Sequence, residues 1–231
     1  MVKSALIVGA GSGISASFAR LLAREGYTLA LAARSTAKLA DLQAETSASA
    51  LACDAAEPNQ VAALFESVIR ESGVPDVVLY NASARARGPL VDLKPAEVEH
   101  ALRVSAYGGF LVGQQAAKHM LPRGSGAIFF TGASASVKGY AQSAPFAMGK
   151  FALRGLAQSM ARELQSKGIH VAHFVIDGGV RNPATGRLEP ADAPDSFLDP
   201  DAIAQTYLAV LKQPRSAWSL EVELRPWVER F

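Results

Sequence analysis

Short apolar runs alternate along most of the chain with longer stretches in which apolar side chains recur every three or four residues. The first pattern predicts β-strands and the second predicts amphipathic helices. The predicted strands cover residues 5–8, 28–32, 50–53, 77–80, 127–131, 170–176 and a last one near 220–224. The predicted helices cover residues 16–25, 36–46, 58–72, 96–119, 144–167 and 200–213.

Most of these strands are apolar at every position, as is typical of strands that are buried on both faces of a parallel sheet. Repeated strand–helix units with right-handed crossovers predict a doubly wound α/β fold, a Rossmann-type three-layer sandwich. With 231 residues, 49% of them hydrophobic, the chain fits a single domain over residues 1–231. The Pro-, Gly- and Asp-rich segment 177–199 follows the sixth strand, and we interpret it as a substrate loop or, alternatively, a plain surface loop.

A glycine-rich turn directly follows the first strand. It reads Gly9-Ala10-Gly11-Ser12-Gly13 and leads into a predicted helix. Glycines allow a tight turn and a close approach of phosphate oxygens to backbone N–H groups, and the helix N-terminus favours negative charge. The turn therefore predicts a dinucleotide-binding site, although a glycine-rich run also occurs in ordinary strand-to-helix loops.

The end of the second strand indicates which dinucleotide is bound. A carboxylate there would bind the ribose hydroxyls of NAD(H) and repel a 2′-phosphate. The chain has the neutral Ala33 followed by Arg34, whose guanidinium suits a phosphate, so we expect NADP(H) in preference to NAD(H). Asp54, directly after the third strand, is a candidate acceptor for the adenine amino group.

Composition excludes several other classes of protein. A formal net charge of +2 gives no strong field toward nucleic acid or a membrane surface. A single cysteine, Cys53, excludes an internal disulfide and fits a reducing compartment. No signal peptide, membrane-length apolar stretch or metal-ligand spacing is visible, so we expect a cytoplasmic protein without a metal.

Several motifs together resemble the short-chain dehydrogenase/reductase family. Val8 to Ser15 matches its Thr-Gly-x-x-x-Gly-x-Gly turn, Asp54 matches its Asp after the third strand, and Tyr80-Asn81-Ala82-Ser83 matches its Asn-Asn-Ala-Gly bend. The resemblance spans nearly the whole chain and implies a nicotinamide cofactor in an extended cleft. The implied cofactor-binding residues are Gly9, Gly11, Ser12, Gly13, Ile14, Arg34, Asp54, Asn81, Ala82, Lys150 and Val180.

At the catalytic end the chain departs from the family's Asn-Ser-Tyr-Lys set. Lys150 stands at the lysine position, but Phe146, four residues earlier, replaces the tyrosine that protonates the substrate oxygen. The serine position falls on Ala133, and a slip of one residue in this loop would place Ser134 there instead. Ser105 occupies the asparagine position. General acid–base catalysis contributes roughly 10²–10⁴-fold, so the missing phenol is a substantial departure.

Other groups near the cleft are candidate proton donors. Tyr140 lies between the serine loop and Phe146 and ranks first, ahead of Tyr107 and a water polarised by Lys150. The candidate catalytic set is therefore Lys150, Ser134 and Tyr140. Asp177 is a further carboxylate near the nicotinamide position, unless it merely caps a turn.

The primary hypothesis is an NADP(H)-dependent oxidoreductase that acts on a small or medium carbonyl or alcohol. The alternative is an NADP(H)-binding protein with little or no redox turnover, acting as a sensor or partner subunit. The apolar lining expected for the cleft favours an uncharged substrate, whereas Arg85 and Arg87 would favour an anionic one.

We also expect a homodimer or homotetramer. The C-terminal run 218–227 carries Trp218 and Trp227, and aromatic residues at a sheet edge suggest a subunit interface. The helical stretch 151–165 is also apolar over much of its surface, and the family resemblance implies assembly through these surfaces.

Overall fold

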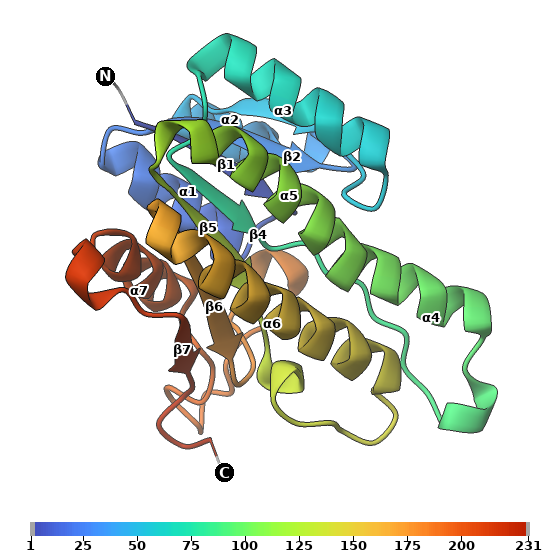
Figure 1. Ribbon diagram of the computed structural model, residues 1–231. Helices are drawn as coiled ribbons and strands as arrows, with labels where there is room; N and C mark the ends of the chain where they lie inside the picture. The colour runs from blue at the N-terminus through green and yellow to red at the C-terminus, as the bar shows by residue number, and fades with distance from the viewer. Residues whose placement is uncertain (1–2, 230–231) are drawn as a thin grey trace.

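The computed structural model describes residues 3–229, which form a single α/β domain around one seven-stranded parallel sheet (Figure 1). The strand order is β3-β2-β1-β4-β5-β6-β7, so the order reverses between β1 and β4. Ligands bind beyond the carboxyl ends of the strands at such a switch point. The strands are β1 (Ser4–Val8), β2 (Thr28–Ala33), β3 (Ser49–Ala52), β4 (Val77–Tyr80), β5 (Gly126–Thr131), β6 (Ile169–Ile176) and β7 (Glu221–Leu224).

Helices cover both faces of the sheet and create two apolar cores. Side chains of α1 (Ile14–Arg24), α2 (Ala40–Thr46) and α7 (Pro200–Leu211) pack on one face. Side chains of α3 (Pro58–Ser72), α5 (Gly108–Met120) and α6 (Ala144–Leu164) pack on the other. Because both faces are covered, every residue of β1, β4 and β6 is buried, which explains their continuous apolar runs.

The structure confirms the predicted strands to within one or two residues and corrects one predicted helix. The stretch 96–119 is expected to be one helix, but α4 (Pro95–Leu102) is separated from α5 by a π-helical segment, Arg103–Tyr107. The segment is a single π-helical turn inside a continuous helical stretch, so the helical spacing of apolar residues on either side of it still predicts one helix. Figure 1 shows α4 extending away from the sheet beside α6.

The segment 177–199 crosses the glycine-rich turn. Its backbone pairs Val180 with Leu198 and Asn182 with Arg187, and it contains a short 3₁₀ turn, Pro183–Thr185. The Asn182 side-chain amide hydrogen-bonds to the Ser12 hydroxyl, at 3.1 and 3.2 Å. This segment therefore lies at the carboxyl edge of the sheet, against the start of α1.

The two tryptophans of the C-terminal run 218–227 have different surroundings. Trp218 stacks on His170 with ring centroids 4.7 Å apart, and its indole N–H donates to the Gln213 carbonyl. Trp218 is therefore half-buried, because the turn before β7 folds one face of its ring onto β6. Trp227 alone of the two is largely exposed.

Gly108 allows α5 to approach the end of β4 closely. A Cβ atom at this position would lie 2.5 Å from the Tyr80 hydroxyl and 2.7 Å from the Ala55 carbonyl oxygen. The Tyr80 hydroxyl itself donates to the Val104 carbonyl in the π-helical segment. This contact fixes the position of the π-helical segment relative to the sheet.

We therefore expect Gly108→Ala to lower the free energy of unfolding by about 1–3 kcal/mol, because an added methyl group overpacks this contact. Gly155→Ala is the matched control, since a Cβ at Gly155 in α6 meets no atom within 4 Å. Gly155→Ala should raise stability by up to about 1 kcal/mol through helix propensity. Urea denaturation of both variants tests this contrast, and equal effects at the two positions would contradict the packing argument.

Candidate active site

The first cavity lies beside the switch point and contains much of the predicted nucleotide site. Its volume is about 240 Å³. It brings together six of the predicted cofactor residues, from the ends of β1, β2, β3 and β4: Gly9, Gly11, Arg34, Asp54, Asn81 and Ala82. Lys38 also lines it and places a second cation beside Arg34, which the sequence analysis missed.

The glycine-rich turn is shaped by two close contacts. Gly9 has a φ of +84°, and a Cβ there would lie 2.3 Å from the Ala82 nitrogen, so only glycine fits. The Asn81 amide donates to the Gly9 carbonyl at 3.2 Å. Ser15 replaces the family's last glycine, and its hydroxyl accepts from the Gly11 N–H at 2.9 Å. The serine therefore stabilises the turn.

The turn leaves room for a phosphate. A Cβ at Gly11 would meet no atom within 4 Å, so the space beside this backbone is open. The first N–H groups of α1 have no partner within the helix and are donors for an anion. A second cavity of about 380 Å³ lies here, and Ser12, Gly13, Ile14 and Val180 line it. The arrangement fits the diphosphate of a dinucleotide.

Asp54 is partly used within the protein. One of its carboxylate oxygens accepts from the Ala56 N–H at 3.0 Å, and its own N–H donates to the Gln60 side chain at 2.8 Å. These bonds fix the bend after β3. The carboxylate still lines the first cavity.

Lys150 lies on α6 and is buried, with 3% of its surface exposed. Its ammonium donates to the Thr131 carbonyl at the end of β5, at 2.7 Å. Burial lowers the pKa of Lys150 to about 7, and the charge of Arg85 contributes in the same direction. Phe146 lies one helical turn earlier, with its ring centroid 5.9 Å from the Lys150 Nζ.

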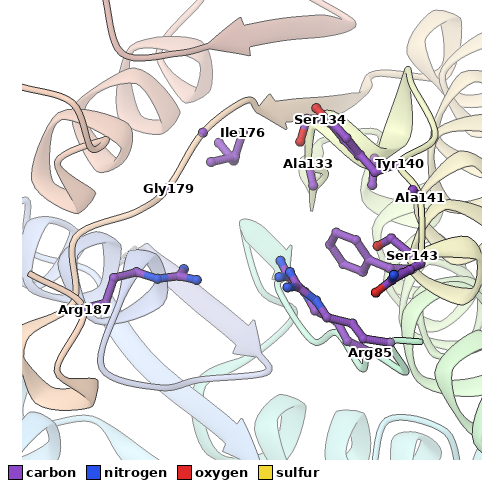
Figure 2. Close-up of a pocket in the computed structure, with 14 residues that line it drawn as sticks. Arg85, Ala133, Ser134, Tyr140, Ala141, Ser143, Ile176, Gly179 and Arg187 are labelled. Atoms are coloured by element: carbon purple, nitrogen blue, oxygen red, sulfur yellow. The ribbon is translucent and has the colours of Figure 1, made fainter. Parts of the chain in front are cut away.

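Phe146 lines a third cavity, with a volume of about 460 Å³. Figure 2 shows this cavity in close-up. Ser134 and Tyr140 line it together with Ala133, so the structure brings these sequence-predicted residues to one place. Lys150 is behind Phe146 and does not line this cavity. Tyr107 does not line it either, because it faces outward and stacks on Phe110 with ring centroids 6.1 Å apart.

Tyr140 belongs to a chain of polar contacts. The Lys138 ammonium lies 5.8 Å from the centroid of the Tyr140 ring, and its interactions with Tyr140 and then Asp177 raise the pKa of Lys138. The Lys138 ammonium lies 3.3 Å from the Asp177 carboxylate. Asp177 is buried and also pairs with Arg225 at 3.5 Å, so it is an anchor for two cations rather than a turn cap.

The Ser105 hydroxyl, at the family's asparagine position, has a structural partner. It lies in the π-helical segment, is fully buried, and lies 3.2 Å from the Ala84 nitrogen and 3.3 Å from the Ala84 carbonyl oxygen. It therefore fixes the backbone that follows β4. Among residues 3–229, no group of three His, Cys, Asp or Glu side chains is arranged to hold a metal ion.

A family model described as short chain dehydrogenase matches residues 3–192. The chain belongs to the short-chain dehydrogenase family. A short-chain dehydrogenase structure from Rhodopseudomonas palustris is 34% identical, with a TM-score of 0.83, and the match covers 97% of this chain and 99% of that one. A metagenomic short-chain oxidoreductase in complex with NADP is 27% identical, with a TM-score of 0.84 and 98% of each chain covered.

One curated relative with a named activity matches a shorter part of this chain. It is a 3-oxoacyl-[acyl-carrier-protein] reductase of Staphylococcus aureus, strain Mu50, which is 32% identical over 177 residues. That match covers 74% of this chain and 72% of the relative. Within the part of the chain that the structure describes, no helix is both long and apolar enough to cross a membrane.

Three residues near the cavities are not predicted by the sequence: Lys38, Lys138 and Arg187. Lys38 follows Arg34 by four residues, a spacing that could have drawn attention to it. Nothing local distinguishes Lys138 or Arg187 from surface cations. Their positions depend on how the loops after β5 and β6 fold back over the sheet edge.

The burial of Lys150 predicts a pH-dependent stability. Below about pH 7 the folded protein carries the buried charge, and above this pH it releases a proton that the unfolded chain keeps until about pH 10.5. Between these values the unfolded state binds more protons, so the free energy of unfolding should rise with pH. The Lys150 contribution should approach about 1.4 kcal/mol per pH unit within this window.

Lys150→Met should remove this contribution, whereas Lys167→Met, at an exposed lysine in the 3₁₀ turn that follows the same helix, should keep the wild-type slope. Denaturant titrations between pH 7 and pH 10 measure the three slopes. Parallel profiles for the wild type and Lys150→Met would show that the lysine is not desolvated.

Proposed function

We propose that this short-chain dehydrogenase is an NADP(H)-dependent oxidoreductase that acts on a small or medium carbonyl or alcohol with a non-standard proton donor. The supporting observation is that the three cavities adjoin one another along the sheet edge. The first and second share Gly11 and Asn81, and the second and third share Arg187. An extended dinucleotide would fill the first two, and its reacting end would face the third.

The residues present fit NADP(H) in particular. Arg34 and Lys38 in the first cavity would bind the 2′-phosphate, and Ala33 offers no carboxylate that would repel it. The neighbouring metagenomic structure is itself a complex with NADP. Lys150 would bind the ribose hydroxyls and Val180 the carboxamide, as the family resemblance implies. Bound NADPH would supply the hydride for carbonyl reduction.

Tyr140 is the proposed proton donor. It shares the third cavity with Ser134 and Phe146, the residue at the family's tyrosine position. As hydride reaches the carbonyl carbon, the Tyr140 hydroxyl would protonate the oxygen, and the Lys138 ammonium would stabilise the phenolate that remains. Ser134 would hold the carbonyl oxygen, and the segment 177–199 would close the substrate side of the cavity.

We further propose that the protein is a homodimer or homotetramer. Phe151 and Met148 on α6 are 44% and 50% exposed, and Phe110 on α5 is 41% exposed. These side chains form the outward faces of two long helices on the same side of the sheet. Such large apolar side chains favour burial between copies of the chain.

Cofactor preference tests the nucleotide assignment. Arg34→Ala should lower kcat/KM for NADPH at least tenfold and change that for NADH little, because loss of a charge-assisted hydrogen bond costs about 1.5–3 kcal/mol. Lys38→Ala should act in the same direction. Steady-state kinetics with both cofactors measures the ratio, and an unchanged NADPH/NADH preference in both variants would contradict the assignment.

Carbonyl turnover tests the proton donor. NADPH oxidation is followed with a panel of ketones, aldehydes and enones, using the wild type, Tyr140→Phe and Phe146→Tyr. Tyr140→Phe should abolish wild-type turnover and leave NADPH binding unchanged, because its hydroxyl acts only on the substrate. Phe146→Tyr should raise turnover at least tenfold by restoring a phenol beside Lys150.

The outcomes separate the parts of this proposal. Full activity in Tyr140→Phe would show that another group supplies the proton. Tight NADPH binding without turnover by the wild type or Phe146→Tyr, on any carbonyl, would contradict the oxidoreductase function itself.

A further inference from the structure

Three arginines from two distant parts of the chain meet at the third cavity. Arg85 and Arg87 follow β4, and Arg187 lies in the segment after β6. Figure 2 shows Arg85 and Arg187 reaching into the cavity from opposite sides, with Ser134 and Tyr140 beyond them. None of the three arginines forms an ion pair with another residue in the range 3–229.

This positive charge is not neutralised by the cavity itself. The described residues that line the cavity include no Asp or Glu. Burial lowers the pKa of Arg85, and the charges of Arg87 and Arg187 lower it further. A cavity with one sign of charge and partly desolvated walls attracts and concentrates ligands of the opposite sign.

Phe146 has a specific role in this arrangement. The Arg85 guanidinium carbon lies 4.0 Å from the centroid of the Phe146 ring, a cation–π contact. The Lys150 ammonium also lies near this ring, 5.9 Å from the same centroid. The residue that replaces the expected phenol therefore serves as a platform that directs Arg85 along the cavity wall.

The backbone around each arginine is fixed. Ser105 holds Ala84, the residue before Arg85, by contacts with both its N–H and its carbonyl oxygen. The N–H of Gly88, directly after Arg87, donates to the Gln142 carbonyl on the far side of the loop, at 3.2 Å. Arg187 pairs with Asn182 through two backbone hydrogen bonds. Fixed backbones reduce the entropy lost when a ligand is bound.

We infer that the third cavity binds its carbonyl substrate through an anionic group, a carboxylate or a phosphate, held by Arg85 with Arg87 and Arg187. Guanidinium groups bind both anions by paired hydrogen bonds, and such charge-assisted bonds are the stronger ones in proteins. The inference rests on the proposed function and names the substrate class of that site. It differs from the uncharged substrate favoured by the apolar positions in the sequence.

The diphosphate of the cofactor would compete with a substrate anion for one of these arginines. Arg187 also lines the second cavity, beside the glycine-rich turn, where the diphosphate would lie. Arg85 and Arg87 line the third cavity and are not among the residues around the second. Substitutions at these two positions therefore distinguish a substrate anion from a cofactor phosphate.

The kinetic test compares carbonyl compounds in charged and neutral pairs: pyruvate with methyl pyruvate, and dihydroxyacetone phosphate with dihydroxyacetone. The wild type should have a kcat/KM at least tenfold higher for the charged member of at least one pair. Arg85→Met should raise the KM of that charged member at least tenfold more than the KM of its neutral partner. The pair that responds identifies carboxylate or phosphate.

Arg70→Met is the matched control, because Arg70 lies in the last turn of α3, at the opposite edge of the sheet. It should leave both KM values as in the wild type. Phe146→Leu tests the platform, since it keeps an apolar side chain and removes the ring. It should raise the KM of the charged member in the same direction as Arg85→Met.

A binding measurement separates this inference from the proposed function. Acetate and inorganic phosphate are titrated calorimetrically into the wild type and Arg85→Met, each saturated with NADP⁺. Heat that depends on Arg85 for either anion supports the anion site even if no carbonyl in the panel is reduced, in which case only the proposed function fails.

Equal turnover of the charged and neutral carbonyls, without anion binding, would overturn the inference and leave the proposed oxidoreductase function intact. A raised KM for NADPH in Arg85→Met, with no change for the charged carbonyl, would also overturn it.

Discussion

Burial of both faces of a parallel sheet is the constraint on which the rest of this molecule depends. Every residue of β1, β4 and β6 is buried between two helical layers. Parallel strands all end at the same edge, so the segments that follow them meet there. The nucleotide turn, the arginines and the loop carrying Tyr140 lie at one edge for this reason. Packing of the two cores thus determines which polar side chains share a cavity.

Cationic side chains line the first and third cavities, which lie along the carboxyl ends of the strands. Arg34 and Lys38 lie at the first cavity, and Arg85, Arg87 and Arg187 lie at the third. Three other cations near the carboxyl ends of the strands have acceptors within the protein: the Thr131 carbonyl for Lys150, and Asp177 for Lys138 and Arg225. Among the described residues, the cations that line the first and third cavities form no ion pair. This contrast is expected of a surface that binds anionic ligands.

The Phe146 ring bears on both the proton donor and the positive charge of the third cavity. At the position where the family resemblance assigns a proton donor, the chain has an apolar ring with two cations near it, Lys150 and Arg85. The ring cannot donate a proton, yet its face attracts a guanidinium. The ring thus supports the Arg85 guanidinium, and a phenol from a neighbouring loop, Tyr140, shares the same cavity.

The sequence alone determined the order of strands and helices, the glycine-rich turn and the switch-point nucleotide site. These follow from periodicity and from residues adjacent in the chain, such as Gly9 and Gly11 directly after β1. Only the tertiary structure decided that Arg187 faces Arg85, that Asp177 anchors Lys138, and that Trp218 stacks on His170. These contacts join segments far apart in sequence, and their geometry depends on how the loops fold over the sheet edge. Local patterns determine strands and turns, but packing between distant segments determines which side chains meet.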